Sequence, residues 1–142
     1  MKILIVCTGN TCRSPMAGGL LRRIAGEKGL PLEVRTAGLA SHPNGHVAEK
    51  AVAVMQESGI DISDEYSKPV TPDIFAWADL VVTVQRSHAT YLLEEYPEAE
   101  QKVCFLEYDV PDPYNGSLAD YRKARDQLEV LLSRFALSLQ PD

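Results

Sequence analysis

A chain of 142 residues is long enough for one domain with a substantial hydrophobic core. Its net charge of −6 argues against nucleic acid as a partner, because that binding depends on many Lys and Arg contacts to phosphates. No apolar run approaches the ~20 residues that span a bilayer, which argues against a membrane protein. The apolar stretch after Lys2 is too short for a signal peptide, so we expect a cytoplasmic protein.

Strand-like and helix-like segments alternate along the chain. We expect strands at residues 2–6, 32–36, 80–84 and 102–106, and helices at residues 15–28, 46–58, 71–77, 87–96 and from 117 onward. The first strand is apolar on both faces, which is typical of a central parallel strand, and the second alternates as an edge strand does. The pattern predicts an α/β fold in one domain, residues 1–142, with a parallel sheet covered by helices on both faces.

Residues at the predicted helix ends support these boundaries. Ser14 is a good N-cap for the first helix and Pro15 suits its first position, while Gly29 is placed to end it. Ser117 followed by Asp120 predicts a contact of the capping-box type at the start of the last helix.

The cysteines and histidines do not suggest a metal site. Three cysteines at uneven spacing argue against both a disulfide framework and structural zinc. His42 and His46 could share a helix face, but no third ligand lies near them in the sequence. We therefore expect no metal ion.

The most informative segment is residues 7–14, Cys-Thr-Gly-Asn-Thr-Cys-Arg-Ser, between the first strand and the first helix. Such turns bind anions because backbone N–H groups and the positive end of the helix dipole point at the same place. The helix N-terminus and Arg13 both favour the thiolate of Cys7, which is a good nucleophile. The sequence thus predicts an anion site that contains a reactive cysteine.

Each residue of this loop suits a cradle for a tetrahedral phosphoryl group. Arg13 can bind two phosphoryl oxygens at once through its planar guanidinium. Gly9 permits a tight turn, Asn10 tolerates a left-handed backbone, and Ser14 can donate to the sulfur of Cys7. The candidate phosphate-binding residues are Thr8, Gly9, Asn10, Thr11, Cys12, Arg13 and Ser14.

A second loop carries a candidate acid. Asp112 and Pro113 follow the fourth predicted strand, and ligands of open α/β sheets bind beyond the carboxyl ends of the strands. Asp112 is placed to protonate a leaving group and then to activate water. Each feature also has an ordinary interpretation: a Cys-x5-Arg spacing arises by chance, lone cysteines are often core residues, and Asp-Pro often marks a turn.

The loop, the Thr36-Ala37-Gly38 segment and Asp112-Pro113-Tyr114 together resemble the low-molecular-weight protein tyrosine phosphatases over essentially the whole chain. The resemblance implies a four-stranded parallel sheet of order 2-1-3-4. It implies Cys7 as nucleophile, Arg13 as phosphate clamp, and Asp112 as general acid and then base, with no metal or cofactor. The implied partners are phosphorylated proteins as substrates and inorganic phosphate as product and inhibitor. The resemblance also implies that the protein is a monomer.

One loop position bears on the substrate. Tyrosine-directed members usually carry an aliphatic residue before Cys12, whereas bacterial protein-arginine phosphatases resemble this chain in having threonine, Thr11. A hydroxyl can hydrogen-bond a guanidinium or the attacking water, while a branched apolar side chain suits a phenyl ring. The segment after Gly38, Leu39-Ala40-Ser41-His42, also lacks the aromatic residue that in the family often stacks on phosphotyrosine. We therefore favour phosphoarginine over phosphotyrosine, with Thr11 and Tyr114 as specificity residues, and keep a strictly tyrosine-directed enzyme as the alternative.

Other expectations concern redox chemistry and rival functions. The resemblance suggests that Cys7 and Cys12 pair reversibly and so protect the nucleophile, although Cys12 could simply fill space behind the loop. An arsenate reductase would need two further cysteines, and this chain has only Cys104. A non-catalytic phosphate-binding module would have no use for Asp112. Many family members have a histidine near position 65 that supports the loop; its absence here puts that network in doubt.

Overall fold

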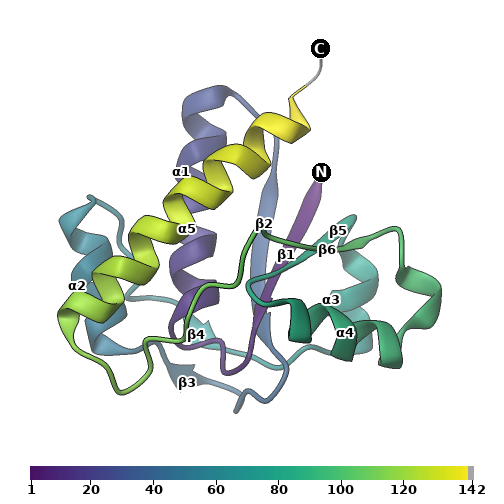
Figure 1. The fold of residues 1–142 in the computed structure, drawn as a ribbon, viewed down its shortest axis with the longest axis horizontal. Coiled ribbons are helices and arrows are strands. Elements are labelled where there is room, and N and C mark those ends of the chain that lie inside the picture. Colours follow the sequence, from purple (N-terminus) through teal and green to yellow (C-terminus); the bar gives the residue numbers. More distant parts are fainter. Residues whose placement is uncertain (141–142) are drawn as a thin grey trace.

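Four parallel strands form the central sheet, in the order β2-β1-β5-β6 (Figure 1). The strands are β1 (Lys2–Cys7), β2 (Glu33–Gly38), β5 (Leu80–Thr83) and β6 (Val103–Phe105). This arrangement, seen in a computed structural model that describes residues 1–140, confirms the predicted order 2-1-3-4. The last two residues of the predicted 1–142 domain lie outside the described part.

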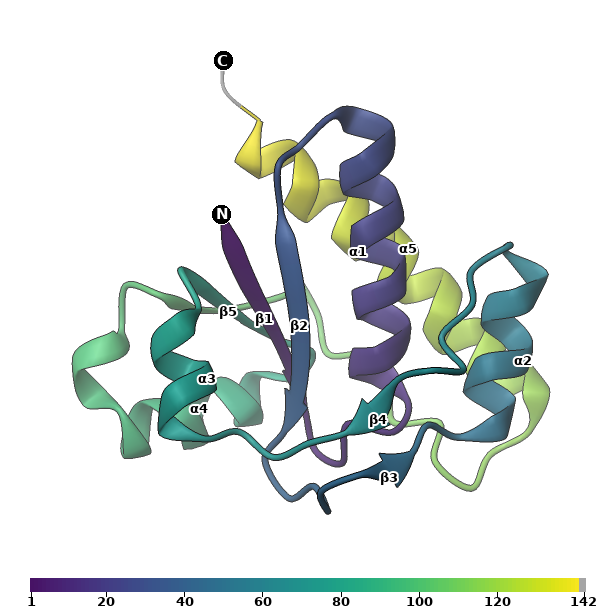
Figure 2. The same cartoon turned by 180° about the vertical axis from the view of Figure 1, so that it is seen from behind.

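Helices cover both faces of this sheet, as predicted (Figures 1 and 2). On one face α1 and α5 lie side by side with α2 beside them, and on the other face lie α3 and α4. Their bounds are α1 (Arg13–Lys28), α2 (Glu49–Glu57), α3 (Pro72–Trp77), α4 (Arg86–Glu95) and α5 (Leu118–Leu139), with a short 3-10 turn at Pro97–Ala99.

Strand β1 lies at the centre because its side chains serve two hydrophobic cores. Ile3 and Ile5 pack into the core beneath α1 and α5, while Leu4 and Val6 pack into the core beneath α3 and α4. None of the four side chains is exposed. Alternating side chains of a strand point to opposite faces, so a strand buried on both faces has to be apolar throughout.

The start of α1 differs from the prediction. The helix begins at Arg13, its N-cap residue is Cys12 without a side-chain cap, and Pro15 is its third residue rather than its first. Ser14 is therefore not the N-cap; its hydroxyl lies 2.9 Å from Sγ of Cys7. The first helical N–H groups thus remain free of a side-chain acceptor, as an anion site requires. At the other end Gly29 does end the helix, in a left-handed conformation with φ of 66°.

The predicted helix at 46–58 begins later, at Glu49, because His46 belongs to a strand. A two-stranded antiparallel ribbon pairs β3 (Gly45–His46) with β4 (Tyr66–Ser67), and it lies next to the carboxyl end of β2 (Figure 2). Asn44, with φ of 61°, turns the chain into this ribbon, and the N–H of Ala48 donates to the carbonyl of Thr11 at 2.9 Å. Pairing with a distant strand outweighs the local helical pattern here.

At the start of α5 the predicted capping box is confirmed. The Ser117 hydroxyl accepts from the N–H of Asp120, and the Asp120 carboxylate accepts from the N–H of Ser117.

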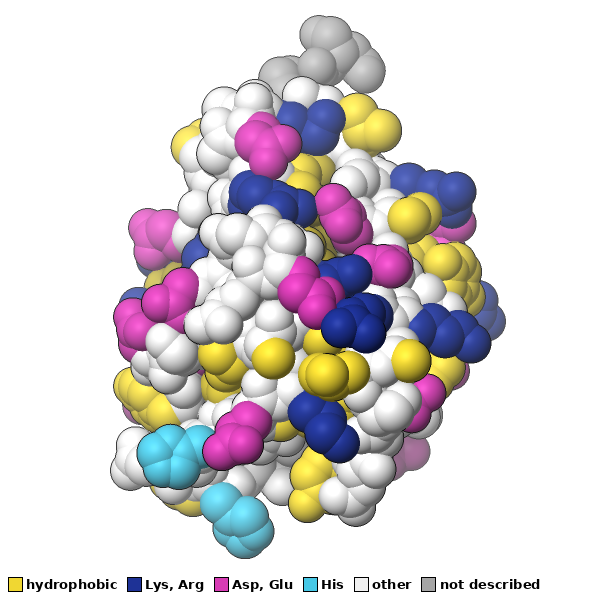
Figure 3. Space-filling model, turned by 90° about the vertical axis from the view of Figure 1, so that its left-hand side faces the viewer, with side chains coloured by type: hydrophobic (Ala, Val, Ile, Leu, Met, Phe, Trp, Pro, Cys, Tyr) yellow, Lys and Arg dark blue, Asp and Glu magenta, His cyan; other side chains and the backbone are white. Residues whose placement is uncertain are grey.

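Within residues 1–140 no helix is both long and apolar enough to cross a membrane. On the side of the molecule that carries α2, acidic and basic side chains are interspersed (Figure 3).

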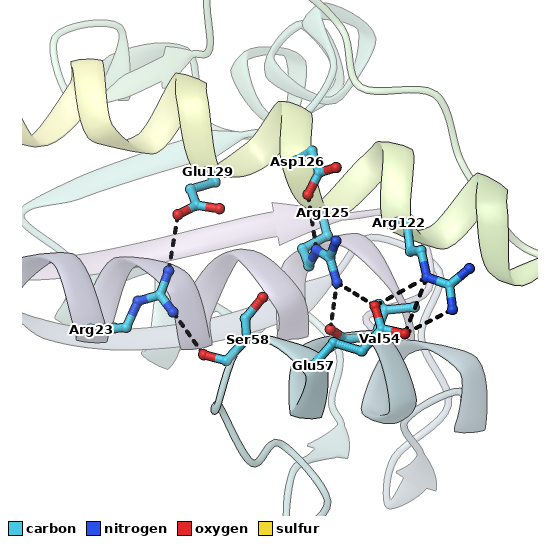
Figure 4. Close-up of polar contacts among 8 residues, drawn as sticks. All are labelled: Arg23, Val54, Glu57, Ser58, Arg122, Arg125, Asp126 and Glu129. Carbon is cyan, nitrogen blue, oxygen red and sulfur yellow. Dashed lines mark hydrogen bonds and ion pairs between the residues drawn. The ribbon is translucent and has the colours of Figure 1, made fainter.

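A cluster of ion pairs joins α2 to α5 (Figure 4). Arg122 donates to Glu57 from Nε, at 3.1 Å to each carboxylate oxygen, and from Nη2 at 2.8 Å, and Arg125 donates to the same carboxylate at 2.7 Å. Arg125 also donates to the carbonyl of Val54 at 2.8 Å. Hydrogen bonds from the two guanidinium groups lower the pKa of Glu57 from 4.5 to about 2.

We expect Glu57→Gln to lower the melting temperature at neutral pH and to reduce the dependence of stability on acid. A carboxyl whose pKa is lowered in the folded state stabilises the fold above its unfolded pKa, and this contribution is lost as the pH falls from 4.5 toward about 2. Thermal unfolding measured across that range tests this. Glu94→Gln, at an exposed glutamate on α4, is the matched control; an equal effect in both variants would contradict the role of the cluster.

Candidate active site

Cys7 lies at the carboxyl end of β1, at the bottom of the loop that leads into α1. It is 3% exposed, and two groups of the same loop point at its sulfur. The Ser14 hydroxyl lies 2.9 Å from Sγ, and the backbone N–H of Asn10 donates to Sγ at 3.2 Å. Hydrogen bonds of this kind stabilise negative charge on the sulfur, in addition to the effect of the helix N-terminus.

Several backbone N–H groups of the loop have no hydrogen-bond partner among residues 1–140. In residues 1–140 the backbone N–H groups of Thr8, Gly9, Thr11 and Cys12 take part in none of the backbone hydrogen bonds. The left-handed residue of the loop is Asn10, with φ of 56°, and Gly9 does not have positive φ. The tight turn therefore depends on the asparagine, and free N–H groups remain to bind an anion.

Asn10 supports the loop without a histidine near position 65. Its side-chain amide donates to the hydroxyls of Ser14, at 2.7 Å, and Thr36, at 2.9 Å. Its side-chain oxygen accepts from the backbone N–H of Lys68 at 3.0 Å. Gly18 makes room for Thr36, since a Cβ at this position would lie 2.8 Å from the Thr36 methyl group. Thr36 and a backbone N–H thus supply the network that the sequence had put in doubt.

Gly38, at the end of β2, allows the loop to pack against the neighbouring strand. It lies opposite Cys7 in the parallel register. A Cβ on Gly38 would come within 2.7 Å of the Thr8 carbonyl oxygen and 2.9 Å of the Asn10 nitrogen. Both contacts are with backbone, so any larger residue would displace the loop.

Arg13 is almost fully buried, at 1% exposure, and its guanidinium is held on several sides. One terminal nitrogen, Nη1, donates to the side-chain oxygen of Gln85 and to the Val110 carbonyl, the latter at 2.8 Å. The other, Nη2, lies 3.5 Å from the Thr8 hydroxyl and 3.6 Å from the Asp112 carboxylate. The partners fix the guanidinium plane, so it is preorganised to bind an anion in a defined orientation.

Asp112 lies across from the cysteine loop, on the segment between β6 and α5. Its side chain is 44% exposed, and Oδ1 accepts from the N–H of Tyr114 at 3.0 Å. The two loops that the sequence placed at one edge of the sheet therefore do meet, about a hundred residues apart in the chain. A carboxyl group that contacts both the guanidinium and solvent can exchange protons with a bound molecule.

The two loops enclose a pocket of about 310 Å³. Its lining comes from the loop of residues 7–14, the segment after β2, the β3–β4 ribbon and the Asp112 loop. The lining residues are Cys7, Thr8, Gly9, Thr11, Cys12, Arg13, Ala40, His42, Gly45, Ser67, Asp112 and Tyr114. Among residues 1–140 no group of three or more His, Cys, Asp or Glu side chains is arranged to hold a metal ion.

Two residues beside the pocket were not identified from the sequence. Gln85, which accepts from Arg13, and His88, which lies 3.0 Å from the Thr8 hydroxyl, follow the carboxyl end of β5. The signal was available, because β5 ends at the same sheet edge as β1. Burial, and then the charge of Arg13, lower the pKa of His88 to about 4, so its ring is neutral at neutral pH.

The other two cysteines differ from Cys7 in their surroundings. Cys12 is buried with Sγ 3.4 Å from the Tyr121 hydroxyl, and burial raises the pKa of its thiol. Cys104, in the middle of β6, is partly buried and its thiol donates to the Val81 carbonyl at 3.5 Å. Burial also raises the pKa of Cys104. All three cysteines are free, and the pairing of Cys7 with Cys12 stays a prediction.

Comparison with known proteins identifies the family. The family model for low molecular weight phosphotyrosine protein phosphatases matches residues 2–142, so the chain belongs to this family. It is 40% identical to the protein-arginine-phosphatase of Bacillus subtilis (strain 168), over 100% of this chain and 99% of that protein. It also matches a solved structure of the YwlE arginine phosphatase, a cysteine-to-serine mutant with a phosphorylated active-site serine. That match has a TM-score of 0.95 at 38% identity and covers 100% of this chain and 97% of that one.

Overall sequence similarity also includes a relative that is named for a different activity. An arsenate reductase of Brevibacillus brevis is 34% identical over 94% of this chain and 92% of that protein. The family is therefore established, while the choice among its activities depends on individual side chains in the pocket.

Proposed function

We propose that this protein removes phosphoryl groups from phosphoarginine residues of proteins through a phosphocysteine. The Cys7 thiolate attacks phosphorus, and the phosphorus–nitrogen bond breaks while Asp112 gives its proton to the departing guanidine nitrogen. The Asp112 carboxylate then takes a proton from water as the water oxygen attacks phosphorus, which releases phosphate and restores the thiolate. Arg13 and the loop N–H groups bind the phosphoryl oxygens throughout.

The observation that carries the choice of arginine is the position of Thr11. It lines the pocket, and within residues 1–140 its hydroxyl has a single, long polar contact of 3.6 Å, with Sγ of Cys12. A free hydroxyl at this wall can accept hydrogen bonds from the N–H groups of a guanidinium. A phenyl ring has no such donor, so the hydroxyl gives it no advantage. From the segment after β2, which the structure describes in full, Ala40 and His42 line the pocket, and no Phe, Tyr or Trp does. The B. subtilis relative named protein-arginine-phosphatase adds support.

A phosphotyrosine-directed enzyme is the second candidate. Tyr114 provides an aromatic wall beside Asp112, and the family is described by its action on phosphotyrosine. Arsenate reduction is less favoured, because Cys104 lies within β6 and does not line the pocket that holds Cys7 and Cys12. A binding module without catalysis leaves the position of Asp112 beside Arg13 unexplained.

We expect Thr11→Ile to shift preference from phosphoarginine toward phosphotyrosine. The substitution removes the hydroxyl and adds apolar surface, so the ratio of kcat/KM for the two peptides falls by about tenfold or more. Thr11→Ser, which keeps the hydroxyl, is the matched control and retains the preference of the unmodified protein. An unchanged ratio in Thr11→Ile would remove the basis for assigning phosphoarginine.

Further properties follow from the same chemistry. Inorganic phosphate, the product, occupies the cradle of its own phosphoryl group and acts as a competitive inhibitor. A reactive thiolate needs a reducing compartment, so we place the protein in the cytoplasm. We further propose that it acts as a monomer, without nucleic-acid or membrane partners. Under oxidation Cys7 pairs with Cys12, which protects the nucleophile.

A further inference from the structure

Two nitrogen atoms, one from His88 and one from Arg13, contact the hydroxyl oxygen of Thr8. His88 Nε2 lies 3.0 Å from Thr8 Oγ1, and Arg13 Nη2 lies 3.5 Å from the same oxygen. His88 is 5% exposed and comes from α4, on the other side of the sheet from α1. Thr8 itself is exposed and lines the pocket beside Cys7 and Arg13.

The protonation of His88 follows from its surroundings. With its pKa lowered to about 4, the neutral ring carries one proton. Nδ1 is buried and has no hydrogen-bond partner among residues 1–140. We assign the proton to Nε2, because a proton on Nδ1 would bury an unpaired N–H group, whereas Nε2–H has the Thr8 oxygen as its acceptor.

This assignment determines what the Thr8 hydroxyl can do. Its oxygen has two lone pairs, and these accept from His88 Nε2–H and from Arg13 Nη2–H. The hydroxyl proton then has no acceptor on either of these neighbours and is free to point into the pocket. A donor at this place lies next to the guanidinium that binds the phosphoryl group.

We propose that the Thr8 side chain is a phosphate-binding group, which donates its hydroxyl proton to a phosphoryl oxygen, and that His88 is the positioning residue that orients it. This goes beyond the backbone N–H groups and Arg13, and it rests on the proposed function. A hydrogen bond to a charged oxygen in a partly dehydrated pocket strengthens binding more than one between neutral groups.

The first test is Thr8→Val, which keeps the shape of the side chain and removes the hydroxyl. We expect the inhibition constant of inorganic phosphate, and KM for p-nitrophenyl phosphate, to rise together by about tenfold to a hundredfold, with kcat changed much less. Thr8→Ser retains the donor and should bind phosphate as the unmodified protein does. Thr90→Val, on the exposed face of α4, is the control for a general loss of hydroxyl.

The second test separates orientation from simple packing. His88→Phe keeps a ring in the buried site without a donor, and His88→Gln provides an amide N–H at a similar reach. We expect His88→Phe to weaken phosphate binding and His88→Gln to retain most of it. The double variant Thr8→Val/His88→Phe should bind phosphate no more weakly than Thr8→Val alone, because the hydroxyl that His88 orients is already gone. Additive losses in the double variant would show that His88 acts independently of Thr8.

The outcomes distinguish this proposal from the proposed substrate. Unchanged phosphate binding in Thr8→Val would overturn the role of Thr8 whichever phosphorylated residue the protein prefers. A preference for phosphotyrosine together with weakened phosphate binding in Thr8→Val would overturn the substrate and support the donor. Failure of the unmodified protein to bind phosphate at all would overturn both.

Discussion

Replacing the Cys7 thiol by a hydroxyl, Cys7→Ser, is expected to abolish turnover while phosphate binding survives. A hydroxyl has to lose a proton before it attacks phosphorus, and it leaves the phosphoryl group far less readily than a thiolate does. Loss of a nucleophile costs several orders of magnitude in rate, so kcat should fall by more than about a thousandfold. Arg13 and the loop N–H groups are unchanged, so inorganic phosphate still binds.

Steady-state kinetics, phosphate titration and intact-mass measurement together test this expectation. Phosphorylated serine occurs in the mutant YwlE arginine phosphatase, which shows that a serine at an active site of this architecture can retain a phosphoryl group. A stable phosphoserine in the Cys7→Ser variant would accordingly support the assignment. Cys104→Ser is the control, because Cys104 lies in β6 away from the pocket and should leave kcat unaffected. Substantial turnover by Cys7→Ser would exclude Cys7 as the nucleophile.

The second large effect is expected from Asp112→Asn. This substitution keeps an oxygen to accept from the Tyr114 N–H but removes the proton that the leaving group needs. General acid catalysis contributes about a hundredfold to ten-thousandfold, so kcat on phosphorylated peptides should fall within that range. Nitrophenolate leaves without help, so turnover of p-nitrophenyl phosphate should fall much less.

The ratio of the two losses is the measurement that matters. Asp109→Asn is the matched control, because Asp109 lies in the same loop but accepts from the backbone N–H of Arg86 instead of contacting Arg13. If Asp112→Asn slowed both substrates equally, its carboxylate would be positioning Arg13, 3.6 Å away, and proton transfer would have to come from another group.

Much of the fold could be predicted from local pattern. An apolar run flanked by turn residues indicates a buried strand, and the alternation of strands with helices predicts the parallel sheet. Helix ends were predicted best where a side chain makes its contact within a few residues, as at Ser117, Asp120 and Gly29. The prediction failed at Ser14 and His46, where a distant partner or the ligand site sets the conformation.

In the candidate site, too, the features set by local sequence could be predicted, and those set by distant contacts could not. The sequence alone was enough to predict an anion site with a reactive cysteine, since a cysteine, an arginine and the start of a helix are contiguous in the chain. It also determined that Asp112 lies at the same sheet edge, because strand ends of a parallel sheet converge there. Three contacts became visible only in the folded chain: Thr36 supports Asn10, Gln85 holds Arg13, and His88 faces Thr8. These contacts join segments 26 to 80 residues apart, and hydrogen bonds over such separations depend on packing that no local pattern encodes.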